Sequence, residues 1–245
     1  MQKLSLNGTW TLEIPGSGFG MVSASVPGSV YHDLLNAQLI PDPFYRDNEM
    51  EALKLMDNNF QYSRIFHVTE DLLSCDALLL RCEGLDTIAE IYINGAAAGS
   101  ADNMHRIWEF DIRKLLQPGE NTISIHFASP TKYIKEAYSR SVADGSSDAM
   151  VGFPHIRKAH CMYGWDWGPR LPDAGIWRDI SIIGVETARI RDVHVLQHHN
   201  AGKVTLEVNT HVTEIAGSAP VSVKVTAPCG KTWTAEGKKA VIEID

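Results

Sequence analysis

The residues best suited to chemistry are concentrated in one stretch, residues 152–170. Its sequence is Gly-Phe-Pro-His-Ile-Arg-Lys-Ala-His-Cys-Met-Tyr-Gly-Trp-Asp-Trp-Gly-Pro-Arg. Glycine and proline make a long strand improbable there, so the stretch is predicted to be a loop. At its centre, Trp165-Asp166-Trp167 suits a sugar, because indole rings stack on the C–H faces of a pyranose and a carboxylate accepts hydrogen bonds from hydroxyl groups.

A second interpretation of the same tripeptide stays open. Trp165 and Trp167 could pack in a core or between domains, and Asp166 could cap a turn. Composition alone favours this interpretation, because aromatic side chains are common in protein cores.

Several histidines also have to be weighed as metal ligands. His198 and His199 are adjacent in a strand pattern that includes His194, and neighbouring strand residues point to opposite faces. We expect these three to be solvated. His155 and His160 flank the aromatic stretch without a carboxylate or thiolate at ligand spacing. The sequence therefore predicts neither a metal site nor a cofactor.

The elements that must position the aromatic stretch are predicted to be mostly strands. Alternation of apolar and polar residues is typical of half-buried antiparallel strands. It recurs at Trp10–Ile14, Ile88–Ile93, Thr122–Phe127, Ile180–Val185, Val193–Leu196, Val204–Val208 and Val221–Val225. Short helices are predicted at Tyr31–Gln38, Asn48–Met56 and Tyr133–Ser139. Asn94-Gly95 predicts a tight turn, because both residue types tolerate positive φ.

This pattern predicts a mainly β protein with two domains. Residues 1–187 are expected to form a β-sandwich, and residues 188–245 a second, immunoglobulin-like sandwich with turns every ten residues or so. An immunoglobulin-like domain usually has about 100 residues, so the second domain is expected to be incomplete. An open sandwich edge promotes pairing between chains, and a homodimer is therefore a possible state.

The composition of the chain argues against some classes of partner. The 245 residues include 30 acids and 22 bases, for a formal net charge of −8. A duplex-binding domain usually carries a basic patch, so nucleic acid is not an expected partner. Four scattered cysteines predict free thiols in a reducing compartment. Neither a signal-peptide pattern nor an apolar run of about 20 residues is found, so we expect a cytoplasmic protein without a membrane partner.

The chain also resembles the β-mannosidases, members of the large glycoside hydrolase family that includes β-galactosidases and β-glucuronidases. Similarity to the wider family begins with Leu6-Asn7-Gly8-Thr9-Trp10 and Val26-Pro27-Gly28-Ser29-Val30, and continues from Ile93-Asn94-Gly95 to Gly119-Glu120-Asn121-Thr122. The narrower resemblance to β-mannosidases is carried by Arg157-Lys158-Ala159, Gly164-Trp165-Asp166-Trp167-Gly168-Pro169 and Gly175-Ile176-Trp177-Arg178.

The resemblance implies a sugar-binding jelly roll of the galactose-binding type, an immunoglobulin-like domain and then an (α/β)₈ barrel with both catalytic carboxylates. It implies that Asp166 hydrogen-bonds a terminal β-mannoside or manno-oligosaccharide, that Trp165 and Trp167 shape the pocket wall, and that Arg157 orients Asp166. The intact protein would then hydrolyse terminal non-reducing β-D-mannose residues with retention of configuration.

Catalysis by this chain alone is not expected. A retaining glycosidase needs two carboxyl groups about 5–5.5 Å apart, and the barrel that carries them needs about 250 residues. In the family, the acid/base is a glutamate that follows an asparagine, and the one Asn-Glu pair here is Asn48-Glu49. It stands where a helix is predicted to begin, and asparagine is a favoured helix cap.

Two alternatives stay open. One is a free-standing carbohydrate-binding module. The other is β-galactosidase or β-glucuronidase specificity within the same family, against which the Trp165-Asp166-Trp167 loop argues.

Overall fold

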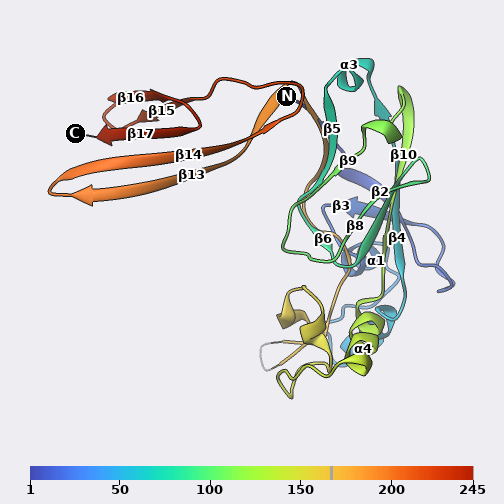
Figure 1. Cartoon of the computed structure of the whole chain (residues 1–245). Helices are drawn as coiled ribbons and strands as arrows, with labels where there is room; N and C mark the ends of the chain where they lie inside the picture. Colours follow the sequence, from blue (N-terminus) through green and yellow to red (C-terminus); the bar gives the residue numbers. More distant parts are fainter. Residues whose placement is uncertain (166–167, 245) are drawn as a thin grey trace. The chain divides into compact units, whose positions relative to one another are not determined.

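A computed structural model of the chain describes residues 1–165 and 168–244 (Figure 1). The fold is mainly β, as predicted, and the chain divides into two compact units. Residues 3–74 and 78–183 form one, which we call the sandwich unit; residues 1–2, 75–77 and 184–245 form the other, which we call the strand unit.

The larger sheet of the sandwich unit has six strands in the order β3-β2-β4-β10-β7-β8, and its neighbours pair antiparallel. The strands are β2 (Gly8–Glu13), β3 (Val22–Val26), β4 (Phe60–Val68), β7 (Ala89–Ile93), β8 (Ala96–Ala101) and β10 (Gly119–Phe127). Asn94 and Gly95 form the turn between β7 and β8 with φ of 52° and 78°, as predicted. Side chains on β10 alternate between the core and solvent, also as predicted.

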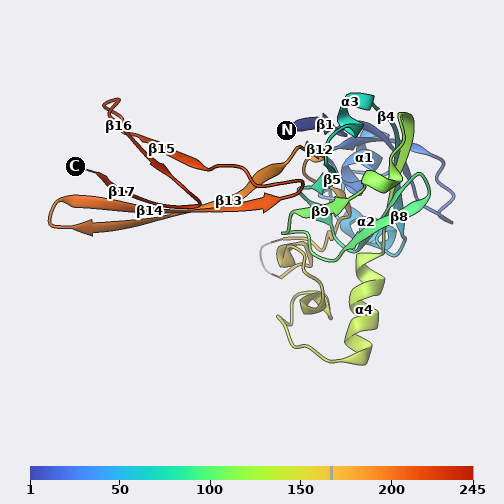
Figure 2. The same cartoon turned by 45° about the horizontal axis from the view of Figure 1, so that its top comes forward.

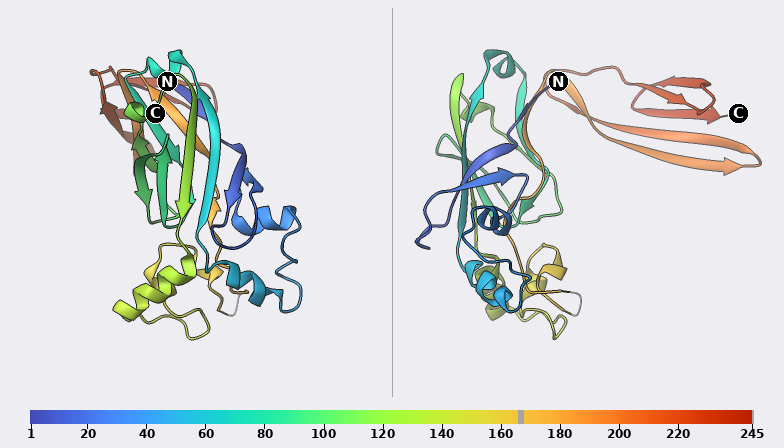
Figure 3. Two further views of the ribbon diagram at one scale, coloured as in Figure 1. Left: turned by 90° about the vertical axis from the view of Figure 1, so that its right-hand side faces the viewer. Right: turned by 180° about the vertical axis from the view of Figure 1, so that it is seen from behind.

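A four-stranded sheet of order β1-β12-β5-β9 forms the second layer, and β6 pairs with β11 in a small ladder (Figures 1 and 3). Their bounds are β1 (Gln2–Ser5), β5 (Ala77–Cys82), β6 (Leu85–Asp86), β9 (Trp108–Asp111), β11 (Gly175–Ile176) and β12 (Ile180–Val185). Every residue of β12 is buried. The core of the sandwich contains Trp10, Phe60, Tyr62, Leu80, Ile125 and Phe127, each at most 2% exposed.

Helices surround the sheets without forming a layer of their own. They are α1 (Val30–Asn36), α2 (Asn48–Leu55), α3 (Glu70–Leu73) and α4 (Pro130–Arg140), with short 3-10 turns η1 (Arg113–Leu115), η2 (Phe153–His155) and η3 (His160–Met162). The three predicted helices are present within a few residues of their expected bounds. The cap predicted at Asn48 is wrong: Asp47 occupies the cap position, and the Asn48 side chain donates to the Asp42 carbonyl at 2.8 Å.

The strand unit contains a three-stranded sheet of order β13-β14-β17 and the hairpin β15–β16. Its strands are β13 (Ala188–Asn200), β14 (Lys203–Glu214), β15 (Ser222–Thr226), β16 (Thr232–Glu236) and β17 (Lys239–Ile244). The predicted burial of one face at Val193–Leu196 is wrong, because β13 is exposed along this whole stretch. The immunoglobulin-like character of this unit stays a prediction.

Candidate functional site

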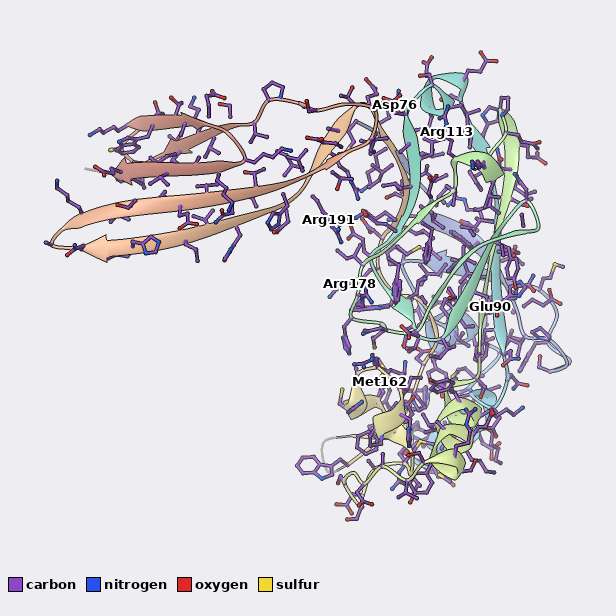
Figure 4. All side chains as sticks on the ribbon, viewed as in Figure 1. Asp76, Glu90, Arg113, Met162, Arg178 and Arg191 are labelled. Carbon is purple, nitrogen blue, oxygen red and sulfur yellow. The ribbon has the colours of Figure 1, made fainter. Side chains whose placement is uncertain are left out.

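The aromatic stretch folds as a loop whose tip is closed by two isolated bridges. Tyr163 pairs with Arg170, and Gly164 pairs with Ala149. The Met150 amide also donates to the Tyr163 carbonyl at 2.9 Å. This loop and α4 lie at one end of the sandwich (Figure 2). Met162, labelled in Figure 4, marks the loop in that view. Of the described residues, Trp165, Gly168 and Pro169 lie beyond these bridges, and we call them the loop tip.

Backbone geometry explains why glycines flank this loop. Gly152 has φ of +89°, and a Cβ there would lie 2.6 Å from the Ile134 carbonyl oxygen on α4. Gly164 has φ of +99°, and a Cβ there would lie 2.8 Å from the Arg170 side chain. Trp165 itself has φ of +79°, a region that non-glycine residues rarely adopt. Such outliers cluster at functional sites, so the conformation of Trp165 supports a role for the loop tip.

A buried ammonium group connects the two ends of the loop. Lys158, 2% exposed, forms an ion pair with Asp86, 3% exposed. The same Nζ atom donates to the backbone carbonyl of Asp173 at 2.8 Å. Lys158 precedes the loop tip and Asp173 follows it, so one side chain fixes both ends. A buried charge is tolerated because it is paired and hydrogen-bonded.

Asp173 adds a titratable group beneath the loop. Its Oδ1 atom accepts hydrogen bonds from the amides of Tyr31, at 3.2 Å, and Ala174, at 2.8 Å. Burial raises the pKa of Asp173 from 3.8 to about 6, although these bonds, a bond from Ser29 and the charge of Lys158 favour the ionised form. Part of the Asp173 population is therefore neutral in mildly acidic solution.

A pocket of about 430 Å³ opens beside the loop tip. Trp165, 38% exposed, and Phe44, 75% exposed, provide aromatic surface in its wall. Glu49, Arg46 and Asp148 provide charged groups. The remaining lining residues are Pro43, Gly164, Gly168, Pro169 and Arg170. A small concave site with aromatic walls and a few polar groups is the usual form of a small-molecule site.

The sequence placed Glu49 only at the start of a helix, and its place in this pocket was not predicted. It lies in the first turn of α2, and its Oε1 atom accepts a hydrogen bond from the Arg170 amide at 2.8 Å. The Arg170 guanidinium in turn donates to the Asp148 carbonyl at 2.9 Å. Glu49 and Arg170 are 121 residues apart, so no local pattern links them.

The structure brings together only part of the predicted site. Trp165 lines the pocket at the loop tip. Asp166 and Trp167 lie outside the described residues. Arg157 is exposed and lines a different cavity, of about 600 Å³, that shares no lining residue with the first. Its backbone pairs with Asn103 and accepts from the Met104 amide at 3.0 Å.

Two kinds of feature are absent from residues 1–165 and 168–244. Within them, no three His, Cys, Asp or Glu side chains are grouped so that they could hold a metal ion. None of the helices described there is long and apolar enough to cross a membrane.

Comparison with known proteins identifies the family of this chain. The profile described as "Glycosyl hydrolase 2 galactose-binding domain-like" matches residues 10–178. A β-mannosidase from Capra hircus is 35% identical in an alignment of length 191 that covers 73% of this chain and 21% of that protein. The chain therefore spans about a fifth of the length of this curated relative.

Solved structures agree. A β-D-mannosidase from Dictyoglomus thermophilum has a TM-score of 0.89 and 31% identity, covering 100% of this chain and 31% of its own. A β-glucuronidase from Ruminococcus gnavus has a TM-score of 0.67 at 15% identity, covering 99% of this chain and 39% of its own, and shows only a shared fold. This chain belongs to the glycosyl hydrolase 2 galactose-binding domain-like family.

Proposed function

We propose that this chain is the non-catalytic N-terminal part of a β-mannosidase-like glycoside hydrolase, and that its loop tip forms one wall of the pocket for a terminal β-mannose residue. The observation that carries the proposal is the pocket of about 430 Å³ whose wall contains Trp165 beside polar groups. Asp166 and Trp167, adjacent to Trp165 in sequence, would supply hydroxyl recognition and further stacking.

The catalytic carboxylates would belong to a barrel domain outside these 245 residues. In the pocket, Glu49 is committed to the Arg170 amide at 2.8 Å, which suits a structural role better than proton transfer. The relatives named as β-mannosidases support mannose over galactose or glucuronic acid, because the β-glucuronidase shares only the fold.

The decisive experiment has two parts. Hydrolysis of aryl β-mannoside, β-galactoside and β-glucuronide by the purified chain should show no turnover above background. Mannose and mannobiose titrations followed by NMR should show weak binding that Trp165→Ala reduces at least fivefold. Trp233→Ala, which removes an indole from the strand unit, is the matched control and should leave binding unchanged.

Two outcomes would contradict the proposal. Turnover of any glycoside that Glu49→Gln abolishes would place the catalytic pair within these residues. Equal mannose affinity for the wild type and Trp165→Ala would remove the loop tip from the sugar site.

We also propose that the chain can form a homodimer through β13. In the described part of the chain β13 pairs only with β14, and it exposes Ile190, Val193 and Val195 at 60%, 48% and 46%. An exposed apolar edge strand favours pairing with another chain. Light scattering should give a dimer that Val195→Lys converts to a monomer; a monodisperse wild-type monomer would rule the dimer out.

A further inference from the structure

The cavity that contains Arg157 has a chemical character unlike that of the loop-tip pocket. Its volume is about 600 Å³, and two short segments of the sandwich unit, residues 103–105 and 154–160, form its wall. The parallel bridge between Asn103 and Arg157 holds the segments together, as does the 3.0 Å hydrogen bond from the Met104 amide to the Arg157 carbonyl. We call it the Arg157 cavity.

The charges that line the Arg157 cavity are all of one sign. Its permanently charged lining residues, Arg157 and Lys158, are both cations, three histidines (His105, His155 and His160) join them, and no carboxylate among residues 1–165 and 168–244 lines it. This is unexpected in a chain with 30 acids and 22 bases. Asp102, next to the lining residue Asn103 in sequence, is exposed but does not line the cavity.

Only one of the two permanent cations is neutralised by the fold. The Lys158 ammonium is paired with the buried Asp86 carboxylate. No ion pair joins Arg157 to any residue in the described ranges 1–165 and 168–244, and the Arg157 side chain is exposed. A guanidinium presents a planar set of N–H donors that matches a carboxylate, sulfate or phosphate. Arg157 therefore has the charge and geometry to receive an anion.

Two of the histidines that line this cavity have defined local contacts. The His160 ring packs edge-on against Phe153, with ring centroids 4.9 Å apart, and its Nε2 atom lies 3.2 Å from the Ile156 carbonyl oxygen. The His105 amide donates to Asn103 Oδ1 at 2.9 Å, which fixes the turn that carries this residue.

His155 provides an independent sign of a missing partner. Its Nε2 atom is shielded from solvent and has no hydrogen-bond partner among the described residues. Buried polar atoms in native proteins are nearly always hydrogen-bonded, and an exception calls for an explanation. His155 also lines the Arg157 cavity, where a bound ligand could bring an acceptor for this atom.

We propose that the Arg157 cavity is a second binding site, specific for a carboxylate, sulfate or phosphate group. Its volume lies within the range of about 300–1,000 Å³ typical of small-molecule sites, so it has room for a sugar that bears the anion as well as for a free ion. The site requires neither the loop tip nor mannose, and it goes beyond the proposed function.

The test uses the full 245-residue chain and three probes: inorganic phosphate, glucuronate and uncharged mannose. NMR of the histidine rings should show saturable shifts at His105 and His160 with phosphate and glucuronate. Arg157→Gln should weaken both at least tenfold, whereas Arg157→Lys should restore part of the affinity because it keeps the charge. Arg140→Gln, which removes an exposed arginine from the end of α4, should change nothing.

The three probes distinguish a sugar-borne anion from a free one. The variants distinguish this proposal from the one for the loop tip. Tighter binding of glucuronate than of phosphate would identify a sugar-borne anion, and similar affinities a free anion. Loss of mannose affinity in Trp165→Ala with anion affinity intact concerns the loop tip, whereas loss of anion affinity in Arg157→Gln concerns the Arg157 cavity. Absent histidine shifts with both anions, or equal anion affinity in Arg157→Gln and Arg140→Gln, would overturn the proposal.

Discussion

The sandwich unit and the strand unit contain similar ion pairs in opposite surroundings. In the sandwich unit, the Lys158 side chain is fully buried and that of its partner Asp86 is 5% exposed. In the strand unit, Lys238 Nζ lies 2.6 Å from Glu214 Oε1, with side chains 49% and 42% exposed. We infer that the fold depends on the buried pair, whereas water can replace the exposed pair.

Apolar side chains differ between the units in the same way. Ile125 on β10 is completely buried, whereas Val195 on β13 is 46% exposed. Both lie in antiparallel ladders, opposite Tyr62 and Val208 respectively. Ladder hydrogen bonds are therefore common to both units, and burial distinguishes them. We infer that the buried core stabilises the sandwich unit, whereas the apolar side chains of β13 stay accessible to solvent.

The largest expected effect comes from the two ion pairs. Lys158→Met leaves the Asp86 carboxylate buried without its cation and should lower the free energy of unfolding of the sandwich unit by about 3–5 kcal/mol. Lys238→Met, its matched control, should cost about 0–1 kcal/mol. Urea denaturation with hydrogen exchange assigned to each unit measures both. Equal costs would show that burial does not distinguish the pairs.

Truncating apolar side chains should give a somewhat smaller difference in unfolding free energy between the two units. Ile125→Ala removes a buried side chain and should cost about 2–5 kcal/mol. Val195→Ala removes surface that is already about half exposed, so we expect a change of about 0.5 kcal/mol or less. Thermal unfolding of both variants, at concentrations where the chain is monomeric, tests this. A large cost for Val195→Ala in the monomer would mean that β13 is covered after all.

Local patterns were sufficient to predict much of the fold. Alternation located β12 at its observed bounds, Ile180–Val185, and Asn94-Gly95 located the turn between β7 and β8. The same alternation predicted a buried face on β13 and failed. Whether an alternating strand is buried depends on another layer covering it, and a strand's own sequence does not contain that layer.

The candidate site was predictable only where its residues are close in sequence. Trp165 was identified from its own tripeptide, and it lines the loop-tip pocket. Contacts over long sequence separations were not predictable: Lys158 and Asp86 are 72 residues apart, and Glu49 and Arg170 are 121 apart. Lysine is rarely buried, so composition also argued against the position that Lys158 occupies.

The smallest expected effect is the dependence of the free energy of unfolding on pH. Its sign should be opposite in the two units. Burial raises the pKa of Asp173 from its ordinary value of 3.8 to about 6 in the sandwich unit. The folded state therefore holds this proton more tightly than the unfolded state. The resulting stability is complete below about pH 4 and is lost as the pH rises through about 6. Because Asp173 is only part-buried, we expect about 1–2 kcal/mol.

Glu207 in the strand unit should behave in the opposite way. A hydrogen bond from Asn209 lowers the pKa of this exposed carboxyl group, so its contribution is present above its ordinary pKa and is lost as the pH falls. Unfolding free energies of the wild type, Asp173→Asn and Glu207→Gln at pH 4 and pH 7 measure both. The advantage of the wild type over Asp173→Asn should shrink as the pH rises, and its advantage over Glu207→Gln should grow. If both advantages changed in the same direction, the surroundings of these carboxyl groups would not set the sign of their contributions, and the contrast between the units would not extend to the pH dependence of stability.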